Sequence, residues 1–235
     1  MSSSTMLMQI LERPDVWRGD ALARAALPGV PTGFADLDRE LPGGGWPRGG
    51  LTELLPLRRG VGELSLLLPA LARLSRDELA WLVCIAPPYL LYAPALQAGG
   101  VDLSRLLVAS APGRDAAWAC ERSLAADGVG AIVVWLPEVQ ATSLRRLQLA
   151  AETSQALLFV FRPAACASQP SPAPLRLALE AEGEQLIVHL LKRRGSAQPL
   201  PLPIAVQRPL RLRHALARPA SALPAARSLS RPAIA

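Results

Sequence analysis

The chain lacks the residue types that several kinds of functional site require. It has 235 residues but one lysine (Lys192), two histidines and three cysteines. Three widely spaced cysteines do not make a disulfide framework, and with two histidines they do not make a zinc site. No apolar run reaches the roughly 18 uncharged residues that span a bilayer, and residues 1–4 show no signal-peptide pattern. We therefore expect a cytoplasmic protein without a metal.

Acidic residues are absent from the last part of the chain. The formal net charge is +6, and from residue 208 onward there is no acid but there are six arginines, Arg208, Arg211, Arg213, Arg218, Arg227 and Arg231. The rest of the chain is near neutral, which argues against a broad nucleic-acid surface. Residues 204–235 show no hydrophobic period and predict a tail without fixed structure. This tail either binds an acidic partner or phosphates, or is simply solvated.

Apolar runs and helical patterns alternate along the middle of the chain. Runs without in/out alternation predict buried parallel strands at 51–55, 81–85, 106–108, 132–135 and 156–161. Helices are expected between them, at 63–75, kinked or frayed by Pro69, and at 89–98, 115–126 and 143–153. Together these elements predict a doubly wound α/β core over residues 30–203, preceded by a helical segment at 1–29.

An antiparallel hairpin is expected after the alternating units. Segments 175–179 and 186–191 flank the turn residues Glu182, Gly183 and Glu184, which is a hairpin pattern. The predicted fold is therefore a mostly parallel sheet extended by a C-terminal antiparallel hairpin.

The loop after the first strand has the position of a phosphate-binding loop. Its residues are Pro56, Leu57, Arg58, Arg59, Gly60, Val61, Gly62 and Glu63, between a strand and a helix, where open α/β sheets hold phosphate on backbone N–H groups. The fixed positions of the pattern G-x-x-x-x-G-K-[ST] fall on Pro56, Val61, Gly62 and Glu63, and none matches. No other register supplies a lysine. Arg58 and Arg59 either meet an anion or are solvated.

Several motifs in this order resemble RecA-family cores. They are residues 30–38 (VPTGFADLD), the glycine-rich run 42–47 (PGGGWP), residues 51–54 (LTEL), 100–107 (GVDLSRLL) and the Walker B-like strand 131–134 (AIVV). Residues 16–19 (VWRG), the run 42–47 and residues 191–195 (LKRRG) most resemble the ImuA family, a RecA-like component of bacterial mutagenic translesion-synthesis cassettes. The resemblance implies a RecA-like core of the phosphate-loop type.

The same resemblance implies that the nucleotide site is degenerate. The RecA catalytic glutamate falls on Pro88, the Walker B aspartate on Trp135, and the glutamine that couples nucleotide state to DNA binding near Pro163. Hydrolysis needs a phosphate clamp, a metal ligand and a base, and none is in place. Glu138 is the one candidate for a displaced carboxylate. We therefore expect no ATPase activity and no cofactor.

A basic cluster, Lys192, Arg193 and Arg194, ends the predicted hairpin. In RecA-like assemblies such a cluster reaches a neighbouring subunit; the alternative is a charged strand end at the surface. Together with Arg208, Arg211 and Arg213 it forms the candidate partner interface.

A core kept without its reaction indicates a non-catalytic adaptor, and the ImuA resemblance implies that it acts in SOS-induced mutagenic translesion DNA synthesis. Such an adaptor is expected to contact RecA and ImuB, an inactive Y-family polymerase by family resemblance. The alternatives are a DNA-stimulated ATPase with unconventional ligands, a cell-division inhibitor like SulA and a plain DNA-binding protein.

Overall fold

The computed structural model describes residues 29–111, 113–193 and 200–206. Residues 1–28 of the expected helical segment 1–29, with the motif at 16–19, and residues 207–235 of the expected tail 204–235 lie outside these residues. In chain order the elements are α3 (Ala35–Glu40), β1 (Gly50–Pro56), α4 (Leu68–Arg76), β2 (Trp81–Ile85), α5 (Ala93–Ala98), η1 (Leu103–Arg105), β3 (Leu106–Ala109), α6 (Arg114–Leu124), β4 (Val129–Trp135), α7 (Ala141–Ser154), β5 (Leu157–Phe161), η2 (Ala164–Ser168), β6 (Leu175–Glu182), β7 (Gln185–Lys192) and β8 (Leu202–Ile204).

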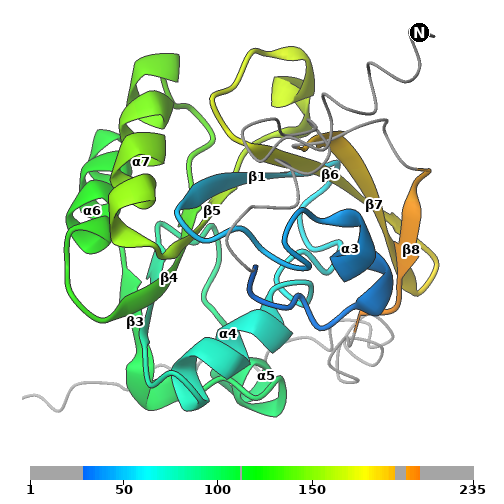
Figure 1. The fold of residues 1–235 in the computed structure, drawn as a ribbon, viewed down its shortest axis with the longest axis horizontal. Helices are drawn as coiled ribbons and strands as arrows, with labels where there is room; N and C mark the ends of the chain where they lie inside the picture. Colours follow the sequence, from blue (N-terminus) through cyan, green and yellow to red (C-terminus); the bar gives the residue numbers. More distant parts are fainter. Residues whose placement is uncertain (1–28, 112, 194–199, 207–235) are drawn as a thin grey trace, which may run out of the picture.

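A single mixed sheet organises the described residues (Figure 1). Its eight strands have the order β3-β2-β4-β5-β1-β6-β7-β8. Strands β1 to β6 pair with one another in parallel, whereas β7 pairs antiparallel with both β6 and β8. The α/β class, the mostly parallel sheet and the C-terminal antiparallel hairpin are therefore confirmed. The last strand, β8, crosses the boundary at residue 203 that the sequence suggests for the core.

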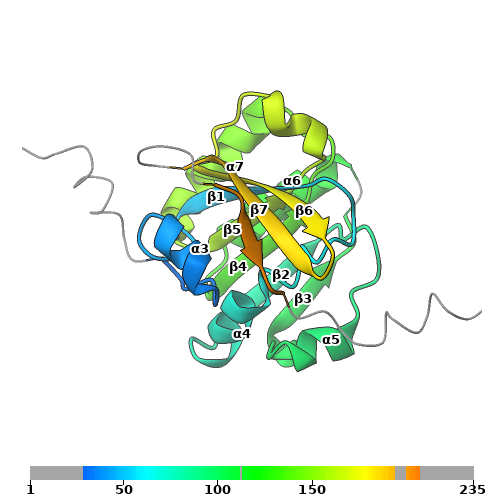
Figure 2. The same cartoon turned by 90° about the vertical axis from the view of Figure 1, so that its right-hand side faces the viewer.

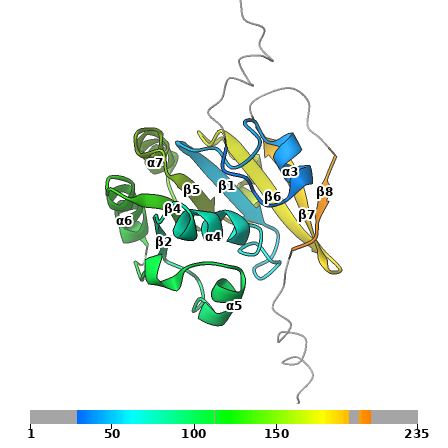
Figure 3. The same ribbon diagram turned by 60° about the horizontal axis from the view of Figure 1, so that its bottom comes forward.

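Helices cover both faces of the parallel part of the sheet. One buried cluster joins Leu37 of α3 and Leu71 of α4 to Leu54 of β1. The other joins Cys120 of α6 and Leu144 of α7 to the opposite face. Figures 1 and 3 show α6 and α7 on one side of the sheet, with α3 and α4 on the other. Because both faces are covered, β1 is buried along almost its whole length, as a parallel strand in such a sheet should be.

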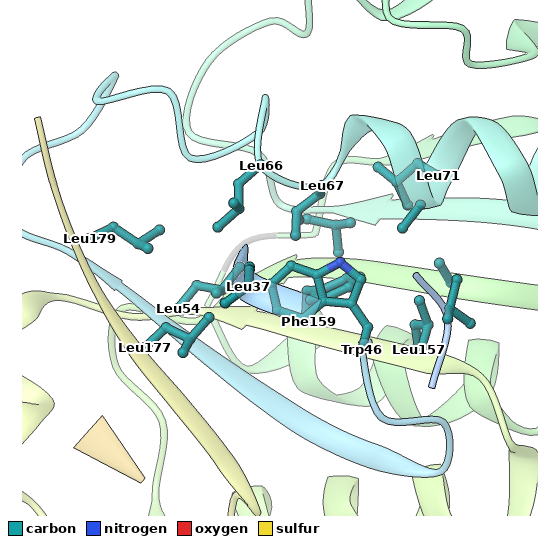
Figure 4. Close-up of a cluster of buried hydrophobic side chains, with 14 of the residues drawn as sticks. Leu37, Trp46, Leu54, Leu66, Leu67, Leu71, Leu157, Phe159, Leu177 and Leu179 are labelled. Carbon is teal, nitrogen blue, oxygen red and sulfur yellow. The ribbon is translucent and has the colours of Figure 1, made fainter. Parts of the chain in front are cut away.

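The glycine-rich run before β1 places a tryptophan in the core. The ring of Trp46 is fully buried and meets the ring of Phe159 edge-on, with centroids 5.2 Å apart. Leu37, Leu54 and neighbouring leucines surround the pair (Figure 4). Backbone hydrogen bonds hold Trp46 against Val30, with Val30 N donating at 2.9 Å and Trp46 N at 2.7 Å. This bridge fixes the entry to the first strand.

Two helices begin later than the sequence pattern suggests. The helix expected from residue 63 begins at Leu68, and the helix expected from residue 89 begins at Ala93. In each, a proline is in the first turn, Pro69 in α4 and Pro94 in α5. Proline lacks an N–H and is favoured in that turn, where the N–H groups have no helical partner. Of the two effects expected at Pro69, the kink is therefore wrong, because Pro69 belongs to the helix start.

The described helices include none that combines the length and apolar composition of a bilayer-spanning segment.

Candidate functional site

The positions compared with the RecA nucleotide site lie along one edge of the sheet. Strands β1, β2, β4 and β5 are parallel members of one sheet, so their carboxyl ends meet at the same edge. The loop 57–67 follows β1, Pro88 follows β2, Trp135 ends β4, and Pro163 is the second residue after β5. This edge is where open α/β sheets bind ligands.

In the loop after β1, a carboxylate side chain accepts hydrogen bonds from the loop's own backbone N–H groups. Glu63 accepts hydrogen bonds from two backbone N–H groups, that of Gly60 to Oε1 at 2.9 Å and that of Gly62 to Oε2 at 3.1 Å. Both glycines have positive φ, 78° and 98°, and this backbone conformation is open to glycine at little cost. The Glu63 carboxylate is therefore bound to the type of donor that a phosphate loop offers to phosphate.

The remaining loop residues are divided between core and solvent. Pro56 is half-buried at the end of β1, and Val61 is buried in the cluster with α4. Arg58 and Arg59 are exposed, and neither forms an ion pair with a described carboxylate. These two arginines are the free positive charges of the loop.

The position compared with the Walker B aspartate carries a ring packed on a ring. Trp135 is half-buried and stacks on Phe161, with centroids 5.1 Å apart and an angle of 16° between the planes. Pro88 and Glu138 are exposed, and Pro163 precedes the short helix η2 as an exposed residue. In the part of the chain that the structure describes, no group of three or more His, Cys, Asp and Glu side chains is placed to hold a metal ion.

A buried ion cluster lies beside this edge, and sequence reasoning missed it. The Glu53 carboxylate on β1 is fully buried and accepts from Arg162 at 2.8 Å and from Nε of Arg176 at 2.5 Å. Arg176 also donates to the carbonyl oxygens of Cys166 and Ala167 in η2. The cluster thus ties β1, the end of β5 and β6 together.

The cluster contains two cations for one anion. Nη2 of Arg162 donates to Gln169 at 3.2 Å, whereas its buried Nε has no hydrogen-bond partner. A buried guanidinium is costly unless paired, and losing the shared carboxylate leaves two unpaired ones. The one sequence signal was an acidic residue inside the apolar run 51–55, which does not indicate its partners.

The predicted partner-interface residues are only partly described. Lys192 ends β7 and donates to the carbonyl oxygen of Ser171 at 2.9 Å. Arg193 is half-buried and pairs with the carboxylate of Glu40 at 2.8 Å, and it also contacts the Glu40 carbonyl oxygen. Both side chains therefore have partners within the chain. Arg194, Arg208, Arg211 and Arg213 lie outside the described residues.

A comparison with protein families shows which family the chain belongs to. The family described as the MT3502 N-terminal domain matches residues 39–166, more than half of the chain. The chain belongs to this family. The part matched to the MT3502 N-terminal domain runs from the end of α3 to η2 and includes the loop after β1, Pro88, Trp135 and Pro163. It also includes Glu53 and Arg162 but not Arg176. No curated protein matches the chain.

Proposed function

We propose that this protein is a non-catalytic RecA-like adaptor of SOS-induced mutagenic translesion DNA synthesis, which contacts RecA and an ImuB-like inactive polymerase. The observation that carries the non-catalytic part is the pairing of the Glu63 carboxylate with the N–H groups of Gly60 and Gly62. A nucleotide phosphate needs donors of this kind, so it competes with a carboxylate that is part of the same loop. The loop keeps the strand-to-helix position of a phosphate site but supplies its own anion.

The other groups that phosphoryl transfer needs, a metal ligand and a base, are not at the positions where the RecA resemblance expects them. Transfer of a phosphoryl group relies on positioning, on a metal held by carboxylate or hydroxyl oxygens, and on cations that neutralise the developing charge. Trp135 offers a ring stacked on Phe161 where the RecA resemblance expects the metal-binding aspartate. Pro88 has no proton-accepting group where the resemblance expects the catalytic base. The residues at these two positions therefore support the absence of ATP turnover.

The adaptor part of the proposal is supported by the retained fold and by the RecA and ImuA resemblance. Six parallel strands with helices on both faces form a stable core. Such a core can present surfaces to partner proteins without catalysing a reaction. The ordered motifs from residue 30 to residue 134 resemble RecA-family cores, and residues 16–19, 42–47 and 191–195 most resemble ImuA. This resemblance supplies the partners.

The experiment measures turnover and partner binding on the same purified chain. ATP hydrolysis is followed by phosphate release with and without single-stranded DNA, for the wild type and for Glu138→Gln. We expect no rate above background in either protein. We also expect the full chain to co-purify with RecA and with the ImuB-like polymerase. A chain ending at Val206 tests whether Arg208, Arg211 and Arg213 contribute to that binding.

A DNA-stimulated rate that Glu138→Gln abolishes makes the protein an ATPase and overturns the proposal. Absence of both partners from the co-purified complex overturns its adaptor part.

A further inference from the structure

Large apolar side chains are exposed on the two loops that flank the degenerate site. In the loop after β1, Leu57 is 56% exposed, and in the segment between β2 and α5, Tyr89, Leu90 and Tyr92 are 67%, 98% and 55% exposed. Scattered apolar residues are normal on a protein surface, whereas a contiguous apolar patch marks an interaction site. The four exposed residues form an interaction site only if their loops leave the same edge of the sheet.

The two loops share one edge of the sheet and one cavity. Both follow parallel strands and therefore leave the same edge of the sheet. Leu64, from the loop after β1, and Leu91, from the segment between β2 and α5, line the same small apolar cavity. Figures 2 and 3 show the two loops on the same side of the molecule, beyond the strand ends. We call the six exposed residues Leu57, Arg58, Arg59, Tyr89, Leu90 and Tyr92 the carboxyl-edge patch.

The charge of the carboxyl-edge patch is positive. Arg58 and Arg59 are exposed and form no ion pair with a described carboxylate. The one acidic residue in their loop, Glu63, is bound to the N–H groups of Gly60 and Gly62. Its charge is directed at the loop backbone, so the two guanidinium groups remain available to a partner.

We propose that the carboxyl-edge patch binds an acidic amphipathic segment of a partner protein, with apolar side chains against Leu57, Tyr89 and Leu90 and carboxylates against Arg58 and Arg59. Tyrosine and arginine are the residue types that contribute most to protein interfaces, and an apolar centre with a charged rim is the usual arrangement. An arginine fork also matches a carboxylate in a two-point contact. This inference rests on the proposed adaptor function, because it assigns a surface through which an inactive core acts.

A protein segment fits this edge better than a nucleic acid does. A DNA strand carries a phosphate at every nucleotide, and binding without sequence preference needs a groove of cations that follows the backbone. In the part of this edge that the structure describes, carboxylates lie around Arg58 and Arg59, since Glu138 after β4 and Glu180 and Glu182 at the end of β6 are exposed. A continuing phosphate backbone would meet these carboxylates, whereas a segment with apolar and acidic faces needs only the patch.

Fluorescence anisotropy on the full chain tests the proposal. The probes are two fluorescein-labelled amphipathic 18-residue peptides with the same leucine face, one with a glutamate polar face and one with a lysine polar face, and a labelled dT30 strand. The patch variants are Leu90→Ser and the double change Arg58→Ser with Arg59→Ser. The matched control is Arg145→Ser with Leu149→Ser, which removes an exposed arginine and a 62%-exposed leucine from α7.

We expect the glutamate peptide to bind the wild type and the control equally and each patch variant at least tenfold more weakly. The comparison between variants decides the result, because the arginines after residue 207 attract any polyanion. Unchanged binding in the patch variants overturns the proposal, as does equal affinity for the lysine peptide. Loss of dT30 binding in the patch variants without loss of peptide binding assigns the patch to DNA.

Phosphate release from ATP is measured on the same samples so that the two proposals fail separately. Turnover with intact peptide binding contradicts the non-catalytic function but leaves the patch in place. If there is no turnover and the patch variants bind the peptide as well as the wild type does, only the patch proposal is contradicted.

Discussion

Trp135 stacks on Phe161 with 5.1 Å between the ring centroids. The two residues end neighbouring parallel strands, β4 and β5, in register with each other. At this edge an ATPase would need an oxygen ligand for Mg²⁺, and the protein has an aromatic pair instead. Stacked rings contribute about 0.5–1.5 kcal/mol beyond the area that they bury. The edge is thus packed for stability at the point where the RecA resemblance expects a metal.

Replacing Trp135 therefore changes stability and creates no activity. We expect Trp135→Ala to lower the free energy of unfolding by about 2 kcal/mol. The change removes the ring that stacks on Phe161 and the apolar area that this half-buried side chain buries. Trp135→Phe should retain most of that stability, and Trp135→Asp should give no Mg²⁺-dependent ATP turnover. Urea unfolding followed by circular dichroism measures the first two. An alanine variant as stable as the wild type contradicts the structural role.

Glu53 should be among the residues most sensitive to substitution. Its carboxylate is shared by Arg162 and Arg176 in the buried cluster, and removing one partner of a buried ion pair costs about 3–5 kcal/mol. Glu53→Ala should therefore unfold at a much lower urea concentration than the wild type. The matched control is Glu78→Ala, which removes the ion pair with Arg48 at a half-exposed site and should cost at most about 1 kcal/mol. Similar effects in the two variants would argue against a tightly coupled buried cluster.

The strands of the parallel sheet were the part of the fold that the sequence predicted best. The exception is β3, which was expected to be buried but is an edge strand with Leu107 and Val108 exposed. Uninterrupted apolar runs such as 81–85 can be buried on both faces only in a covered sheet, so their composition carried the information. The order of the strands was not predictable in this way. It depends on pairings between distant segments, such as β1 with β5 and β6, and composition does not encode them.

Helix starts and polar contacts show where local pattern failed. Pro69 and Pro94 lie in apolar stretches that continue in both directions, so the pattern alone placed the helix starts too early. The partner of Glu53, Arg162, is 109 residues away, and nothing in the run 51–55 specifies it. Glu63 was compared only with a magnesium-binding hydroxyl. Its role as an acceptor for the loop N–H groups depends on the positive φ of Gly60 and Gly62, which follows from the folded loop.

Two neighbouring glycines of the run 42–47 should respond differently to alanine. A Cβ on Gly45 would lie 2.2 Å from the Val30 carbonyl oxygen, which accepts the hydrogen bond of Trp46 N. The backbone must therefore shift, and we expect Gly45→Ala to cost about 3 kcal/mol. Gly44 has a φ of +73° and no atom within 4 Å of an added Cβ, so Gly44→Ala should cost about 1 kcal/mol from backbone strain alone. Thermal unfolding measures both, and equal costs would contradict the bridge.

Two buried cysteines should resist alkylation. Burial raises the pKa of the Cys84 thiol from 9.0 to about 12, and burial and the nearby Glu121 carboxylate also raise the pKa of Cys120. The thiolate is the reactive form, so iodoacetamide at pH 8 should label both positions slowly in the native protein and fully in guanidinium. Mass spectrometry of the peptides measures this. Fast native labelling of Cys84 would contradict its burial.

The same pKa shifts give the sign of a pH effect on stability. In the unfolded chain these thiols lose their protons near pH 9, whereas folded Cys84 keeps its proton to about pH 12. Their contribution to stability is therefore complete below pH 9 and falls as the pH rises from 9 toward 12. Cys84→Ala and Cys120→Ala should each make the alkaline loss of stability less steep in urea titrations at several pH values.

The most direct test of the account is an isothermal titration of ATP with Mg²⁺ into the purified full chain. Glu63 holds the N–H groups of Gly60 and Gly62, and Trp135 leaves no metal ligand at the end of β4. We therefore expect no saturable heat of binding at millimolar ATP. A saturable isotherm with a dissociation constant in the micromolar range, weakened by Arg58→Ala and Arg59→Ala, would show that nucleotide phosphate displaces Glu63 from the loop. It would contradict the claim that this site has lost its ligand.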